Sequence, residues 1–179
     1  MLFRSDNGTT GLVDGSRVAK HDPRMAAIGD VDETNSAIGM AAALLPAGDD
    51  RTRLTVIQND LFDLGADFAT PGDDFAPSQM ALRIVASQVA RLESEIDAMN
   101  EALAPLDSFI LPGGSQAAAA IHIARATARR AERTATFAAT QIALNPQALA
   151  YLNRLSDYLL DRKSTRLNSS HRCISYAVF

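Results

Sequence analysis

This 179-residue chain has few or none of several sequence features that would point to a particular class of protein. It has one cysteine, Cys173, so no internal disulfide can form, which fits a cytoplasmic protein. No apolar run approaches the roughly 20 residues of a membrane span, and the first residues lack the basic-then-apolar pattern of a secretion signal. Neither His21 nor His122 has a glutamate three residues before it. The sequence therefore excludes the Glu-x-x-His pairs of a di-iron bundle and predicts no metal-ligating set.

Residues 161–179 differ in kind from the rest of the chain. Back-translation of 161–171 and 174–179 can give a common sequencing-library adapter and its continuation, with 172–173 in the place of an index. We therefore expect the native sequence to stop near Leu160 and the remainder to be no part of the native fold. The tail holds four of the 17 basic side chains and one of the 21 acidic side chains. The rest of the chain therefore carries 13 basic and 20 acidic side chains, which gives a net charge of −7. A domain with this much negative charge is expected to bind nucleic acid poorly, because it repels the phosphate backbone.

Helix signals follow one another along residues 22–160, which we expect to form one domain. Asp22 before Pro23 and Asn145 before Pro146 are N-caps followed by proline at the first helical position, and Ser115 is a third cap. The third helix, whose apolar stripe runs from Val85 to Met99, is predicted to have roughly 25 residues and a length of nearly 40 Å. No strand is predicted, so the expected fold is all-α, a five-helix up-and-down bundle. Apolar residues recur at steps of three or four in the first three helices: Ile28, Val31, Ile38, Leu45; Leu54, Ile57, Leu61, Leu64, Phe68; Val85, Val89, Leu92, Ile96, Met99.

The N-terminal segment 1–21 is rich in glycine, threonine, serine and aspartate. It contains Lys20, the only lysine outside the tail. Backbone N–H groups, hydroxyls and an ammonium suit a phosphate, but the composition also fits a flexible terminus. Because no Gly-Lys-Ser/Thr ending is present, the segment is not a Walker loop.

Arg125, Arg129 and Arg133 recur every four residues and are expected to share one face of the fourth helix. Like charges at this spacing destabilise an isolated helix by a few tenths of a kcal/mol per pair. The three guanidinium groups therefore need an anionic counterpart. Carboxylates elsewhere in the fold and a polyphosphate are the two candidates.

Seven segments between residues 4 and 160 carry a family resemblance: GTTGL, GSRVAK, GDVDETNSAIG, IQNDLFDLGADFA, SFILPGG, ARATARRAER and YLNRLSDYL. Together and in this order, they resemble the ATP-dependent cob(I)alamin adenosyltransferases of the propanediol-utilisation type. The resemblance implies a cytoplasmic homotrimer with active sites between subunits. Its implied reaction transfers the 5′-deoxyadenosyl group of ATP to cobalt and releases triphosphate. Mg²⁺, a corrinoid reductase and a cobalamin-dependent acceptor enzyme are the further partners it implies.

The resemblance also implies an ATP site. Guanidinium forks and a lysine point charge suit phosphate oxygens. In place of the family's usual Thr-Gly before Asp6, this chain has Arg4 and Ser5, and a serine at a glycine position is expected to hinder a tight backbone approach to ATP. The residues expected on ATP are Arg129, Arg130, Glu132, Arg133 and Asn153, with Thr10, Gly11 and Lys20 over the phosphates.

On the corrinoid side, the resemblance pairs Asp32 with Arg125 to keep the corrin seated. It places Phe109 where an aromatic ring displaces the lower axial ligand of cobalt, leaving four-coordinate Co(II) that is easier to reduce. With Arg129, these are the expected catalytic residues. Taken singly, Asp32 and Arg125 also fit an ordinary interhelical ion pair, and Phe109 fits a core position.

Two other functions share much of this pattern. A carrier that hands adenosylcobalamin to a mutase without chemistry would need the same binding residues. A purely structural helical bundle would leave the arginine face and Lys20 unexplained. Turnover distinguishes the enzyme from the carrier, and failure to bind any nucleotide would favour the structural bundle.

Overall fold

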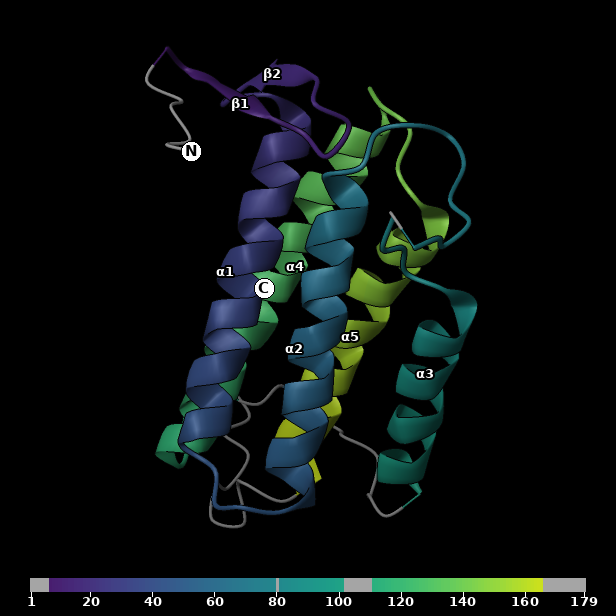
Figure 1. The fold of residues 1–179 in the computed structure, drawn as a ribbon. Helices are drawn as coiled ribbons and strands as arrows, with labels where there is room; N and C mark the ends of the chain where they lie inside the picture. Colours follow the sequence, from purple (N-terminus) through teal and green to yellow (C-terminus); the bar gives the residue numbers. More distant parts are fainter. Residues whose placement is uncertain (1–6, 80, 102–110, 166–179) are drawn as a thin grey trace, which may run out of the picture.

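The computed structural model describes residues 7–79, 81–101 and 111–165. Within them, α1 packs against α2 and α4, α4 packs against α5, and α5 packs against α3 (Figure 1). The expected five-helix bundle is confirmed. Its helices are α1 Pro23–Ala43, α2 Asp49–Phe68, α3 Ala86–Asn100, α4 Gln116–Ala139 and α5 Pro146–Thr165.

Three helices begin at the capping residues that the sequence indicates. The Asp22 carboxylate accepts the Arg24 N–H at 2.8 Å, and the Ser115 hydroxyl accepts the Ala118 N–H at 3.2 Å. Asn145 Oδ1 accepts the N–H of Gln147 at 3.0 Å. Each contact satisfies one of the N–H groups that the first turn of a helix leaves without a partner.

The third helix is shorter than predicted. It spans 15 residues, and Val85, just before it, is extended with φ −117° and ψ 159°. The Ile84 N–H donates to Asp67 Oδ2 at 2.9 Å, so this stretch is bonded to α2 and does not enter the helix. Gln88 Oε1 then accepts the Val85 N–H at 2.9 Å and fixes the start of α3.

The prediction that the chain has no strand is wrong. β1 (Thr9–Gly11) and β2 (Arg17–Ala19) form an antiparallel hairpin over the N-terminal end of α1 (Figure 1). Its turn is held by Asp14, whose carboxylate accepts the Ser16 hydroxyl at 2.6 Å and the Ser16 N–H at 2.9 Å. These bonds lower the pKa of Asp14. The Val13 N–H also donates to the Ala69 carbonyl at 3.1 Å, which ties the hairpin to the end of α2.

The core lies between α1, α2, α4 and α5, with one side of α3 added to it. Small side chains let α4 approach its neighbours closely, because alanines occupy most of its buried face. Large side chains from α2 and α5 fill the remaining space. The largest fully buried residues include Tyr151, Tyr158, Phe68, Ile38, Leu54, Ile57, Leu61 and Leu64.

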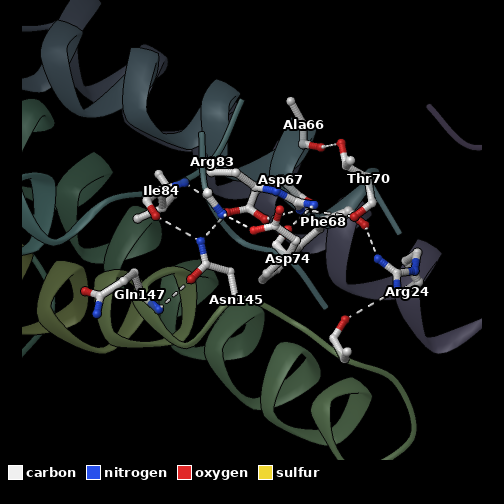
Figure 2. Close-up of polar contacts among 12 residues, drawn as sticks. Arg24, Ala66, Asp67, Phe68, Thr70, Asp74, Arg83, Ile84, Asn145 and Gln147 are labelled. Atoms are coloured by element: carbon white, nitrogen blue, oxygen red, sulfur yellow. Dashed lines mark hydrogen bonds and ion pairs between the residues drawn. The ribbon is translucent and has the colours of Figure 1, made fainter. Parts of the chain in front are cut away.

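A buried polar cluster joins three chain segments at the end of α2 (Figure 2). Asp67 lies 2 % exposed and binds Arg83 Nη1 at 2.7 Å and Asn145 Nδ2 at 2.6 Å. The Arg83 guanidinium also donates to the carbonyls of Thr70 and Asp74, each at 3.1 Å. Because Asn145 is the N-cap of α5, this cluster fixes where α5 starts relative to α2.

A second buried cluster centres on Asp60 of α2. Tyr151 of α5 donates its hydroxyl to Asp60 Oδ2 at 2.7 Å, and Gln88 of α3 donates to Oδ1 at 2.8 Å. Arg91 of α3 forms an ion pair with the same carboxylate. The carboxylate thereby connects three helices through charge-assisted hydrogen bonds.

We expect the alkaline loss of stability to be smaller in Tyr151→Phe than in the unmodified chain. Burial first, and then the Asp60 carboxylate, raise the pKa of Tyr151 well above its ordinary value. Below pH 10 both the folded and the unfolded state keep this proton. Above it, only unfolded tyrosine ionises readily, so the free energy of unfolding falls as the pH rises.

Urea unfolding at pH 8 and at several values above pH 10 measures the effect. At pH 8 the free energy of unfolding of the variant should be about 1.5–3 kcal/mol lower than that of the unmodified chain, because the variant lacks a hydrogen bond to a charged group. An alkaline decline of the same size in both proteins would contradict the assignment of this decline to Tyr151.

Candidate functional site

A surface pocket of about 450 Å³ lies between α4 and α5. On each helix its residues follow the i, i+3, i+4 spacing of a single helix face. Arg129 and Arg133 bring two positive charges to this pocket, and Glu132 and Asp157 bring two negative ones. The full lining is Arg129, Glu132, Arg133, Thr136, Asn153, Ser156 and Asp157.

The pocket brings together four of the residues expected on ATP. Arg129, Glu132 and Arg133 come from α4, and Asn153 comes from α5. Asn153 Nδ2 donates to Glu132 Oε1 at 2.7 Å, which connects the two helices inside the pocket wall. In the described part of the chain, neither Arg129 nor Arg133 forms an ion pair. Their guanidinium groups are exposed and available to an anionic ligand.

Arg130 is directed to a different part of the molecule. Its Nε lies 3.2 Å from Asp30 Oδ1, and its Nη2 pairs with Glu33 of the same helix, α1. Thr134 donates to the other Asp30 oxygen at 2.6 Å. The hydrogen bond to Glu33, followed by that to Asp30, raises the pKa of Arg130. Its guanidinium therefore joins α4 to α1 and does not line the pocket.

Asp32 and Arg125 form no ion pair with each other among the residues that the structure describes. Asp32 is exposed on α1, and Arg125 lies half-buried on α4. The Nε of Arg125 is buried without a hydrogen-bond partner. The ordinary interhelical ion pair considered for these two residues is thus not formed within this chain.

The hairpin residues lie apart from the pocket. Thr10 and Gly11 belong to β1, Lys20 follows β2, and none of the three lines the pocket between α4 and α5. Phe109, like Arg4 and Ser5, falls outside the described residues, and so does the tail beyond Thr165, where α5 ends.

Sequence analysis missed two residues beside the pocket, Arg154 and Glu93. Arg154 Nη1 donates to Asn153 Oδ1 at 2.7 Å, and Arg154 Nε donates to Glu93 Oε1 of α3 at 2.8 Å. No local spacing signals this contact, because Glu93 and Arg154 belong to helices far apart in the sequence. Only the packing of α3 against α5 brings them together.

Residues 3–161 match the family model described as cobalamin adenosyltransferase. The chain belongs to the cobalamin adenosyltransferase family. A corrinoid adenosyltransferase of Mycobacterium leprae is 50% identical to this family member over 165 residues, covering 86% of this chain and 83% of the relative. A cobalamin adenosyltransferase of Cupriavidus metallidurans is 48% identical over 155 residues, covering 86% and 80%.

Solved structures of the family have the same fold as this adenosyltransferase. A phenylalanine-to-alanine variant of the PduO-type ATP:corrinoid adenosyltransferase of Lactobacillus reuteri, complexed with cobalamin and ATP, superposes with a TM-score of 0.81. The two chains are 36% identical, and the match covers 91% of this chain and 90% of the other. The predicted family and the predicted enzyme class, a transferase, are thereby confirmed.

Two further properties of this adenosyltransferase concern the described residues alone. No helix among them combines the length and the apolar character that crossing a bilayer requires. They also contain no group of three or more histidine, cysteine, aspartate or glutamate side chains placed to hold a metal ion.

Proposed function

We propose that this adenosyltransferase moves the 5′-deoxyadenosyl group of ATP to the cobalt of cob(I)alamin at the pocket between α4 and α5. The observation that carries this assignment is the pair Arg129 and Arg133. Their guanidinium groups are one helical turn apart, line the pocket and form no ion pair within the described residues. Two such groups suit the oxygens of a triphosphate.

The chemistry requires positioning and charge stabilisation more than proton transfer. Co(I), a strong nucleophile, attacks C5′ of the ribose with two electrons and forms the cobalt–carbon bond. The C5′–oxygen bond breaks, and its electron pair leaves with triphosphate. Since no proton moves at the reacting carbon, the chain's task is to hold both substrates in line and to stabilise the departing anion.

Mg²⁺ is expected to enter with ATP. In nucleotide sites this ion is usually held by substrate phosphates and one or two carboxylates, and it keeps several waters. Glu132 and Asp157 are the carboxylates in the pocket wall. This donor set fits an ion that arrives with the nucleotide better than one held permanently by the protein.

A homotrimer would complete the site from a neighbouring subunit. Thr10, Gly11 and Lys20 lie outside the pocket of their own chain, so we propose that they close over the phosphates in the pocket of a neighbour. Asp32 and Arg125 fit the same arrangement, because one is exposed and the other has a buried Nε without a partner among the described residues. Sedimentation equilibrium, which gives the mass of the assembly, tests this proposal.

The remaining assignments of the corrinoid side rest on family resemblance. Phe109 is proposed to lie beneath cobalt and displace its lower ligand. A cytoplasmic reductase is proposed to supply Co(I), and a cobalamin-dependent enzyme to take the product.

An anaerobic spectroscopic assay tests the main proposal. Cob(I)alamin, ATP and Mg²⁺ are mixed with the full chain, and the visible spectrum is followed. We expect the Co(I) band to disappear as the adenosylcobalamin spectrum grows. Binding of both substrates without product would instead favour a carrier, and failure to bind any nucleotide would favour a purely structural bundle.

A further inference from the structure

A continuous chain of polar contacts runs from α3 through α5 to α4 and reaches the pocket at Asn153 and Glu132. Glu93 of α3 accepts from Arg154 Nε at 2.8 Å, and Arg154 Nη1 donates to Asn153 Oδ1 at 2.7 Å. Asn153 Nδ2 then donates to Glu132 Oε1 at 2.7 Å. Three helices thus contribute to the environment of one amide.

These contacts permit only one orientation of the Asn153 amide. A guanidinium group only donates hydrogen bonds, and an ionised carboxylate only accepts them. Rotating the amide by half a turn would set Nδ2 against Arg154 and Oδ1 against Glu132, which replaces two attractive contacts with two repulsive ones. The pocket therefore receives an asparagine whose donor and acceptor sides are fixed.

The contacts also leave part of the amide for a ligand. An asparagine amide has two N–H donors and two oxygen lone pairs. Arg154 and Glu132 engage one lone pair and one N–H, so one of each remains. Because Asn153 is exposed at the pocket, these remaining groups can meet a bound molecule.

We propose that Arg154 and Glu93 are positioning residues, which hold the Asn153 amide in the orientation that binds ATP. The inference rests on the proposed function, since it takes the pocket between α4 and α5 to be the nucleotide site. Arg154 acts through Asn153, and Glu93 acts through Arg154. Neither residue lines the pocket itself.

The bridge that Arg154 forms needs the geometry of a guanidinium group. Nε contacts Glu93 while Nη1 contacts Asn153, so one planar group spans two helices. A lysine ammonium is a single point charge and lacks this fixed fork. The hydrogen bond with Glu93 raises the pKa of Arg154 and orients its guanidinium group.

The contribution of this ion pair to folding is expected to be small. The Arg154 and Glu93 side chains are 41% and 48% exposed. Exposed pairs of this kind contribute at most about 1 kcal/mol to stability, since water and salt screen them. A clear loss of ATP affinity with little change in Tm would therefore indicate positioning and not structural damage.

The experiment is a double-mutant cycle on the Kd of MgATP, measured by calorimetry with the full chain. Arg154→Gln is expected to raise Kd about five- to tenfold when Asn153 is present, which corresponds to one hydrogen bond. In the Asn153→Ala background it should have no further effect. Arg154→Lys should resemble Arg154→Gln, and Glu93→Gln should weaken binding in the same direction. Arg51→Gln on α2 and Asp97→Asn on α3 are charge-matched controls at exposed positions.

Two results would overturn the proposal, and a third would overturn its premise. No change of Kd in Arg154→Gln would exclude a positioning role. An equal weakening with and without Asn153 would mean that the guanidinium acts on the nucleotide directly. If Asn153→Ala alone left the Kd unchanged, the pocket would not be the ATP site, and the proposed function would fail independently of Arg154.

Discussion

Arg129→Ala is expected to lower kcat/KM by about a hundredfold or more while leaving the protein folded. Removal of one preorganised group that stabilises developing charge typically costs about 10²–10³ in rate. Arg129 is exposed in the pocket and has no ion pair within the described residues, so its loss leaves no buried group without a partner. Stopped-flow formation of adenosylcobalamin measures the rate, and thermal unfolding checks the fold.

Arg51→Ala is the matched control for this experiment. Arg51 is exposed at the start of α2 and does not line the pocket. It should therefore keep normal turnover, although the net charge changes equally. Normal turnover in Arg129→Ala would remove this arginine from the catalytic site.

Much of the helical framework could be predicted because its signals are local. Asp22, Ser115 and Asn145 make capping contacts with backbone N–H groups only two or three residues away. The apolar stripes repeat at helical spacing, so they indicate a buried face without knowledge of its partner. Local physics was sufficient to predict these elements.

The missed features depend on contacts between distant residues. Each strand of the hairpin has three residues, too few for an alternating pattern, and Val13 anchors the hairpin to Ala69, which directly follows α2. The predicted length of α3 is wrong because the Asp67 carboxylate binds the Ile84 N–H from 17 positions away and keeps this stretch outside the helix. Nothing in the segment around Ile84 shows that such an acceptor is near.

The candidate site also combines features that local spacing predicts with features that depend on contacts between distant residues. Arg129 and Arg133 share a helix face, so their spacing already placed them together. Arg130 is the next residue after Arg129 and points about 100° away around the helix, where Asp30 of α1 binds it. The family resemblance grouped all three, but the partners on α1 direct Arg130 elsewhere.

Arg83→Met should produce the largest loss of stability among the changes considered, about 3–5 kcal/mol. Arg83 is the cation next to Asp67, and the two side chains are 4% and 1% exposed. Removing one partner of a buried pair leaves an uncompensated charge, which costs about this amount. Methionine keeps most of the apolar length, so the effect reports the lost guanidinium more than a cavity. Urea unfolding, with m checked for constancy, measures it.

Two comparison variants test whether the loss of stability comes from the buried guanidinium group of Arg83. Arg51→Met removes an exposed guanidinium and is expected to change stability by less than about 0.5 kcal/mol. Arg83→Lys keeps the charge but cannot reach Asp67 and the Thr70 and Asp74 carbonyls with one ammonium, so it should recover only part of the loss. If Arg83→Met unfolded at nearly the same urea concentration as Arg51→Met, the cluster would not hold the start of α5. Asn145 links Asp67 to α5, the helix that carries Asn153. A loss of stability in Arg83→Met should therefore be accompanied by weaker MgATP binding.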